Sequence, residues 1–245
     1  FEIDPESLDS IGPWTFQDKL SGPMTAHPKI DPESGEMLFF AYNADPENRV
    51  SPRMAFHKAD KHGNLVQSEF FDAPYSAMVH DFIVTKEHVI FPIMPLTSSM
   101  ERAMGGGSLY AWDPTKNSYI GIMPRDGCSS DLRWFEGEPA YVFHPMNAYN
   151  DGDKIVCDVC EYPEAPLFQH ADGSKPDPTK STAKLTRWTF DLNANTDTYH
   201  REKLDDTISE FPRLDERYTG LNYRYGYFAC SVEGGAVDNR YNGIG

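Results

Sequence analysis

The sequence has few cysteines, no long hydrophobic run and a shortage of basic residues, and each of these absences excludes a class of protein. Four cysteines among 245 residues are too few and too scattered for a disulfide scaffold. No run approaches the roughly 18 to 20 apolar residues that a membrane-spanning helix needs. The 22 Lys and Arg against 38 Asp and Glu give a net charge of −16, which leaves no basic field for a nucleic acid. We therefore expect no membrane span and no nucleic-acid partner.

The cysteines also argue against a metal or redox motif. Cys157 and Cys160 form a CxxC pair, but the surrounding KIVCDVCEY is a β-type run, in which residues three apart point to opposite faces. A zinc knuckle or a thioredoxin motif is therefore not expected, and both residues are predicted to be ordinary strand residues. Reduced thiols are typical of cytoplasmic proteins, and we predict a cytoplasmic location.

What the sequence does have is a repeated unit of an apolar run, an Asp-centred turn and a second apolar run. Asp-Pro favours a β-turn, because Asp can bond the backbone two residues on and Pro fixes φ. The unit occurs in residues 2–12, 29–42, 58–71, 111–123 and 189–204. No window shows the apolar spacing of an amphipathic helix over three turns. Strands joined by hairpins leave a sandwich, a barrel or a propeller, and the similarity of the hairpins favours a propeller.

We predict an all-β fold in which residues 1–245 supply about four to five blades of a single β-propeller domain, since one blade takes roughly 40 to 60 residues. The chain begins at Phe1, and its first residues already read as a strand that enters a turn. Because blades close into a ring, we expect an internal segment of a longer chain. Residues 163–184 are predicted to form a loop inserted between two strands of one blade, and long loops in compact domains tend to be functional.

Three of the eight histidines share a context. His27, His80 and His144 each lie in or beside an apolar β run after a turn with Gly or Pro, 53 and 64 residues apart. Equivalent positions on successive blades converge on the propeller axis, so the three can bind one metal there. Imidazole suits iron, zinc, copper and nickel alike. The alternative is three unrelated, half-buried histidines that bond the backbone. The remaining histidines are predicted to lie on the solvated surface: His57, His62, His88, His170 and His200.

Glu210 is the candidate carboxylate partner for one of these histidines. A metal-bound imidazole usually donates its other N–H to a carboxylate. Glu210 lies between Ser209 and the apolar Phe211-Pro212 pair, a setting that favours an inward-facing side chain. The alternative is a loop carboxylate that pairs with Arg213 or Arg217.

Four separate motifs, in order and at similar spacing, resemble the carotenoid cleavage oxygenase family. They are MTAHPKIDPESGEM, HDFIVTKEHVIFP, FHPMNAYNDGD and EFPRLDERYTGLNYRYGY. The resemblance implies a seven-bladed β-propeller with a non-haem Fe(II) on four histidines, three of which are oriented by glutamates. It implies that His27, His80 and His144 are three of the ligands and that Glu210 is one of the glutamates. The fourth histidine is expected beyond Gly245, and the other two glutamates are also expected outside these residues.

Within the family, three local stretches resemble the bacterial lignostilbene dioxygenases. They are the Gly-rich stretch from Phe91 to Gly127, the Arg133-Trp134-Phe135 run after it, and HPMNAYNDGDKIVCDVCEYPEAPLF. In that branch a phenylalanine after the third ligand packs on the stilbene ring, which corresponds to Phe168, or to Leu167 if the register shifts by one. The alternative for Phe168 is a loop aromatic that covers the top of the propeller. The lysine and tyrosine that bind the substrate hydroxyl in that branch are expected upstream of Phe1.

The resemblance implies an Fe(II)-dependent dioxygenase that cleaves a conjugated C=C bond with O₂ into two aldehydes, with a hydroxystilbene or lignostilbene as substrate. The first alternative keeps the chemistry and takes an apocarotenoid polyene, which requires a long apolar tunnel. The second is a non-catalytic propeller that binds a partner on one face. The expected partners are thus a small apolar aromatic or polyene substrate and O₂, with the oligomeric state open.

Overall fold

The structure, a computed structural model, describes residues 1–48, 50–231 and 241–245. Strands dominate these residues, and the α-helical content is one short helix, α1 (Met100–Met104). Short 3-10 helices occupy Ser129–Asp131, Pro178–Lys180 and Glu216–Tyr218. The prediction of an all-β fold is confirmed. No helix in the described part of the chain has the length and apolar character needed to cross a membrane.

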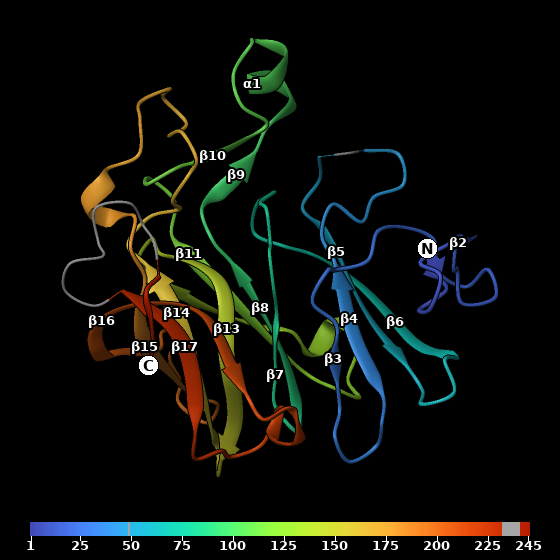
Figure 1. Cartoon of the computed structure of the whole chain (residues 1–245). Helices are drawn as coiled ribbons and strands as arrows, with labels where there is room; N and C mark the ends of the chain where they lie inside the picture. The colour runs from blue at the N-terminus through green and yellow to red at the C-terminus, as the bar shows by residue number, and fades with distance from the viewer. Residues whose placement is uncertain (49, 232–240) are drawn as a thin grey trace.

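Three antiparallel sheets contain most of the strand residues (Figure 1). The first has the order β3 (Lys29–Ile30), β4 (Met37–Ala41), β5 (Arg53–Ala59), β6 (Leu65–Asp72). The second has the order β7 (Ile83–Val84), β8 (His88–Ile93), β11 (Ser118–Pro124), β12 (Arg133–Gly137). The third runs in chain order through β13 (Tyr141–Asp151), β14 (Lys154–Tyr162), β15 (Lys184–Asp191), β16 (His200–Leu214), β17 (Gly226–Ser231) and β18 (Gly243–Ile244).

Two further hairpins complete the strands of the described residues: β1 (Glu2–Ile3) with β2 (Ser10–Gly12), and β9 (Leu96–Ser98) with β10 (Tyr110–Trp112). In Figure 1 the three large sheets follow one another across the molecule, and α1 projects from the hairpin of β9 and β10 at the top. The first strand of each large sheet, β3, β7 or β13, is an edge strand, and β13 lies against β7. Successive sheets whose first strands approach one another are blades of a propeller, so the prediction of a β-propeller is confirmed.

The turns that join the strands have the predicted Asp-centred chemistry. Asp31 Oδ1 accepts hydrogen bonds from the backbone N–H of Glu33 and Ser34, at 2.9 and 2.7 Å. Gly35 then supplies the left-handed position, with φ of 74°. Asp60 makes the same kind of turn between β5 and β6. Local sequence therefore fixes where each hairpin turns.

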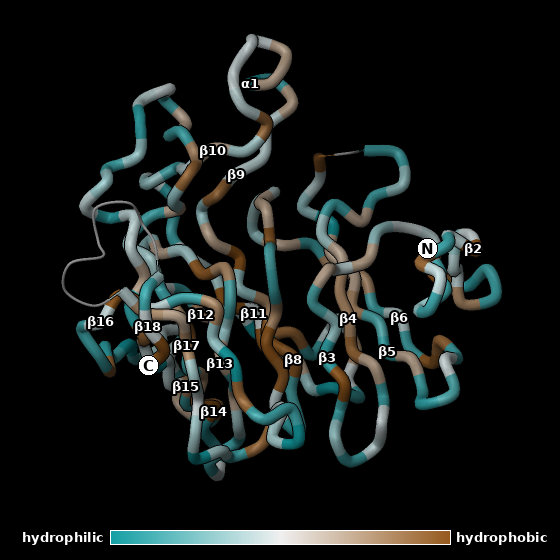
Figure 2. The backbone as a smooth tube through the Cα atoms, in the orientation of Figure 1, coloured by the Kyte–Doolittle hydropathy of each residue, from teal (hydrophilic) through white to brown (hydrophobic). Residues whose placement is uncertain are grey.

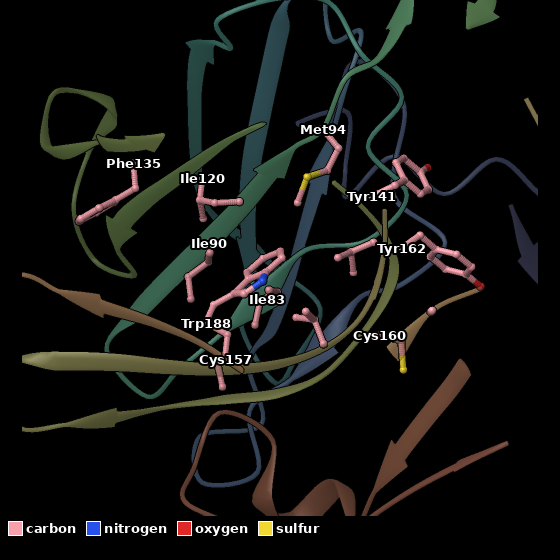
Figure 3. Packing of buried hydrophobic residues seen from close by; sticks show 14 of the residues in the cluster. Ile83, Ile90, Met94, Ile120, Phe135, Tyr141, Cys157, Cys160, Tyr162 and Trp188 are labelled. Carbon is pink, nitrogen blue, oxygen red and sulfur yellow. The ribbon is translucent and has the colours of Figure 1, made fainter. Parts of the chain in front are cut away.

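Apolar side chains fill the space between neighbouring sheets. One cluster joins Leu38 and Phe56 of the first sheet to Phe91 of the second. A larger cluster joins the second and third sheets, where Figure 3 shows Ile90 and Trp188 close together. Figure 2 shows the same pattern along the chain, with hydrophobic segments in inner strands such as β8 and hydrophilic segments at most hairpin tips. Packing between the sheets thus holds successive blades together.

A buried ion pair also joins the first two sheets. Arg125 Nη1 lies 2.6 Å from Asp31 Oδ2, and both side chains are largely buried. Burial opposes the charged form of Asp31, but the N–H of Ser34 and the guanidinium of Arg125 outweigh it and hold the pKa of Asp31 at about 2. The pair therefore fixes the position of the β3–β4 hairpin against the second sheet.

The histidines that we predicted to be solvated do not all lie on the surface. His62 and His200 are exposed, and His88 and His170 are half-buried. The prediction for His57 is wrong, because its side chain is buried in β5, where its ring stacks on Phe39 with centroids 5.0 Å apart. Its Nδ1 lies 2.9 Å from Ser68 Oγ, and burial lowers the pKa of His57 to about 4. An inner strand buries both faces, so a histidine there is covered whichever way it points.

Cys157 and Cys160 are buried strand residues of β14 and carry free thiols, as predicted. Burial raises the pKa of Cys160 to about 12, so its thiol is protonated at neutral pH. Residues 163–183 form the predicted long loop, which connects β14 and β15 of the same sheet. We call this segment the β14–β15 loop.

Candidate metal centre

The three histidines selected from the sequence meet at the inner edges of the three sheets. His27 lies two residues before β3, His80 three residues before β7, and His144 lies within β13. His27 Nε2 is 3.1 Å from His80 Nε2, which is 3.2 Å from His144 Nε2. All three side chains are half-buried. The propeller thus brings together three imidazole nitrogens from sites 53 and 64 residues apart in the chain.

Hydrogen bonds among the imidazoles do not satisfy this arrangement. His144 Nδ1 donates to Glu210 Oε2 at 2.8 Å, so in the neutral ring Nε2 carries a lone pair. His80 Nε2 faces that lone pair on one side and His27 Nε2 on the other. If His80 Nε2 carries the proton, it can donate fully to only one of its two neighbours. If it carries a lone pair instead, that lone pair faces the lone pair of His144. A cation that accepts all three lone pairs removes the conflict.

The distances fit such a cation. Two nitrogens that each lie about 2.1 Å from one metal ion, at a right angle to one another, are about 3.0 Å apart. The two measured separations of 3.1 and 3.2 Å are close to that value. All three ligand nitrogens lie within 4.8 Å of one another, so a single ion between them would be within reach of each. The three histidines can therefore hold a metal ion.

Electrostatics favour the ligand form of the imidazoles. Burial lowers the pKa of His27, and the nearby Asp81 opposes this effect only in part. Burial also lowers the pKa of His80, with the neighbouring His144 and His27 acting in the same direction. Both rings are neutral at neutral pH, which is the state in which imidazole binds a metal.

Glu210 reaches His144 because β16 is irregular at this point. The pairing of β16 with β17 shifts register between Glu210 and Arg213, and Phe211 has a φ of 51°. Glu210 is 2% exposed, and its Oε2 also accepts from the backbone N–H of Phe211. It pairs with neither of the arginines considered as alternatives, and Arg217 pairs with Asp215 instead.

A pocket of about 340 Å³ lies on one side of the histidines. His80, His144 and Glu210 form part of its wall, and most of the remaining wall is apolar or aromatic. The Phe143 ring contacts His80 edge-on at 5.2 Å, and the Phe211 ring lies 5.3 Å from the His144 ring. The other lining residues are Tyr162, Pro166, Leu167, Ser181, Thr182, Ile208, Ser231 and Tyr241. Residues of the β14–β15 loop therefore form part of the pocket wall.

Of the two loop positions named from the sequence, Leu167 rather than Phe168 lines this pocket. Leu167 has a φ of 71° and is 85% exposed, whereas the half-buried Phe168 packs against the large core cluster. The physical reason is that the left-handed backbone at Leu167 turns successive side chains to different sides of the loop, and the larger ring takes the core position. Leu167, the alternative position named from the sequence, therefore lies in the pocket wall, and contact of Phe168 with a substrate ring stays a prediction.

A second cavity, of about 780 Å³, lies against the histidines and has a charged wall. The Lys29 ammonium and the Asp81 carboxylate form an ion pair there at 2.9 Å, with Asp81 5% exposed. This pair links the residue after His80 to the segment that carries His27. Arg213, Glu216 and Arg217 also line the cavity.

Sequence reasoning missed Phe143, Tyr162 and Phe211 as pocket residues. Phe143 directly precedes His144, and Phe211 directly follows Glu210, so their adjacency to the two selected residues was the available signal. Tyr162 ends β14, and burial, followed by the Glu210 carboxylate, raises the pKa of its hydroxyl. No short-range pattern indicates that the end of β14 reaches this pocket.

Known proteins share the sequence and the architecture. A family model described as RPE65, retinal pigment epithelial membrane protein, matches residues 1–244. Isoeugenol monooxygenase of Pseudomonas putida is 38% identical over 229 residues, which cover 93% of this chain and 48% of the relative. Lignostilbene-alpha,beta-dioxygenase isozyme III of Sphingomonas paucimobilis is 34% identical over 233 residues, with 92% and 47% covered.

The crystal structure of Pseudomonas brassicacearum lignostilbene dioxygenase matches with a TM-score of 0.89 at 36% identity, over 95% of this chain and 49% of that chain. The chain therefore spans about half the length of the relatives that it matches. The resemblance that the four motifs carry is confirmed, and the chain belongs to the family of RPE65 and the carotenoid oxygenases.

Proposed function

We propose that the whole protein is a non-haem Fe(II)-dependent dioxygenase that cleaves a conjugated C=C bond of a hydroxystilbene or lignostilbene into two aldehydes. Residues 1–245 are part of its single propeller domain. The observation that carries the proposal is the set of three imidazole nitrogens, 3.1 and 3.2 Å apart, at the wall of an apolar pocket. A half-buried cluster of three imidazoles beside an apolar cavity is an arrangement suited to a metal reaction on an apolar substrate.

The metal is assigned as Fe(II), held by His27, His80 and His144, with a fourth histidine expected beyond Gly245. Three neutral imidazoles leave the charge of the ion uncompensated among its ligands, and Glu210 supplies one negative charge through His144. The bond from Glu210 also fixes the ring and tautomer of His144. When bound, Fe(II) supplies the activation of O₂ that cleavage of a C=C bond requires.

The pocket wall orients the substrate and excludes water. Phe143, Leu167 and Phe211 present apolar surface on which a flat aromatic substrate can lie, with its double bond toward the histidines. Direct contact with the ring is proposed for Leu167, while Phe168 supports the loop behind it from the core. Holding the alkene in one orientation accounts for much of the rate in such a reaction. Both atoms of O₂ enter the two aldehydes, so the balance needs no external reductant.

The substrate class is supported by the relatives and by the wall. Relatives at 34 to 38% identity are named for lignostilbene and isoeugenol, both of which join an aromatic ring to an alkene. The wall includes phenylalanine and tyrosine side chains, and such rings pack well against an aromatic substrate. A cytoplasmic location belongs to the same proposal, supported by the free thiols of all four cysteines.

The test uses the full-length protein with iron, in air, with three substrates in parallel: 4-hydroxystilbene, isoeugenol and an apocarotenal. We expect 4-hydroxystilbene to yield two aldehydes for each O₂ consumed, with no product from the apocarotenal and none from any substrate without O₂. Cleavage of the apocarotenal alone contradicts the substrate class. Faster turnover of isoeugenol than of the stilbene moves the class to single-ring alkenes. Consumption of none of the three contradicts the enzyme proposal and favours a propeller that only binds a partner.

A further inference from the structure

The β14–β15 loop forms the pocket wall with both of its ends. Pro166 and Leu167 come from its first part, and Ser181 and Thr182 from its last part. A loop of this length is costly to order, because each fixed residue loses conformational entropy. The shape of the pocket therefore depends on whatever holds the two ends of the loop in place.

A buried carboxylate at the start of the loop, that of Glu164, contacts other parts of the loop. Glu164 is 3% exposed. Its Oε1 accepts a hydrogen bond from the backbone N–H of Asp177 at 2.6 Å, which joins the first part of the loop to the last. Its Oε2 lies 3.9 Å from Lys180 Nζ, at the end of the same short helical turn.

A third part of the loop also turns toward Glu164. His170 Nε2 lies 3.5 Å from Glu164 Oε1 and is buried without a hydrogen bond of its own. His170 Nδ1 lies 3.0 Å from Ser174 Oγ. With the hydroxyl as donor to Nδ1, the N–H of His170 is on Nε2 and faces the carboxylate. Three parts of one loop thus converge on a single buried negative charge.

The middle of the loop is held separately. The backbone N–H of Trp112 in β10 donates to the carbonyl of Gln169 at 2.9 Å, and the backbone N–H of Ala171 donates to the carbonyl of Trp112 at 2.7 Å. These bonds fix the tip of the loop against β10 but do not reach Pro166, Ser181 or Thr182. The base of the loop is held by the pairing of Glu161 with Lys184 and by the N–H of Ser209, which donates to the carbonyl of Ala183. Beyond that base, the contacts of Glu164 join the first part of the loop to the last.

From these contacts we infer that Glu164 is a positioning residue for the pocket wall, and that it determines how tightly the substrate is held without acting on the metal. The part that concerns the substrate rests on the proposed function. A buried carboxylate that loses its partners is strongly disfavoured, so the loop keeps the shape that preserves them. Replacement of Glu164 should loosen the two ends of the loop and leave the three histidines unchanged.

The experiment compares the full-length protein with Glu164→Ala, Glu164→Gln and, as a matched control, Lys175→Ala, which removes an exposed charge from the same loop. Hydrogen exchange of residues 163–183 should become about tenfold faster in Glu164→Ala, because a hydrogen bond to a charged group is lost. Glu164→Gln retains an acceptor for the N–H of Asp177 and should fall between the wild type and Glu164→Ala. Exchange elsewhere in the chain, and exchange in Lys175→Ala, should not change.

With 4-hydroxystilbene, Glu164→Ala should raise KM about tenfold, with kcat within about twofold and the iron content unchanged. Unchanged loop exchange in both Glu164 variants overturns the inference, as does faster exchange throughout the propeller. Faster loop exchange with the wild-type KM overturns the part about the substrate. If the wild-type protein cleaves nothing, the proposed function fails, and loop exchange together with the Kd of the stilbene still tests Glu164.

Discussion

Two cavities meet at the three histidines, and they differ in the chemistry of their walls. The smaller has Glu210 as its one charged lining residue among Asp, Glu, Lys and Arg in the described chain, and that carboxylate bonds His144. The larger is lined by charged residues of both signs: Lys29, Asp81, Arg213, Glu216 and Arg217. Transfer of an apolar substrate from water into a pocket is favourable, but displacing water from charged groups in the wall costs free energy and opposes it. The comparison favours the smaller pocket as the place of the proposed substrate.

The largest difference between the two cavities should appear when Glu210, the carboxylate in the wall of the apolar pocket, is replaced. Glu210→Gln keeps the size of the side chain but removes the negative charge that His144 faces, so metal affinity or activity should fall roughly 10- to 100-fold. The measurement is metal titration of the full-length variant together with turnover of 4-hydroxystilbene. The matched control is Glu216→Gln, a carboxylate of the charged cavity, for which we expect changes below about twofold. Equal losses of metal affinity or turnover in Glu210→Gln and Glu216→Gln would contradict the distinction between the two cavities.

A smaller effect should follow from a charge placed on the apolar wall. Leu167→Asp puts a carboxylate where the substrate ring is proposed to lie, and KM for the stilbene should rise about tenfold at unchanged iron content. Arg217→Ala removes a charge from the wall of the larger cavity, where the side chain is 84% exposed, and should leave KM within about twofold. Steady-state kinetics of both variants provides the comparison. A larger KM effect for Arg217→Ala than for Leu167→Asp would reverse the assignment of the substrate.

The sequence predicted the features that depend on repetition and failed where the packing of the assembled sheets or a single backbone position decides. Blade spacing brought His27, His80 and His144 into one prediction, because equivalent strands of successive blades face the same axis. Glu210 was found from its apolar neighbours. His57 was placed at the surface because its polar neighbours resemble a turn, and the burial of β5 on both faces is a property of the assembled sheets.

The pocket wall was predicted less well for a related reason. The choice between Leu167 and Phe168 depends on one left-handed residue, Leu167, and leucine gives no sign of such a conformation, whereas a glycine, which adopts positive φ at low cost, would. The contribution of Tyr162 depends on how far β14 extends toward the pocket. The role inferred for Glu164 depends on contacts across 13 and 16 residues of an irregular loop, which have no periodic signature.

The central claim is that the three histidines from three successive sheets hold one iron ion. The direct measurement is the metal content of three purified full-length proteins: the wild type, His80→Ala and, as a control, His62→Ala. His62 is an exposed residue of the β5–β6 turn. The account predicts about one iron per chain in the wild type and in His62→Ala, and loss of both iron and turnover in His80→Ala. Retention of the full iron content and normal turnover in His80→Ala would contradict it.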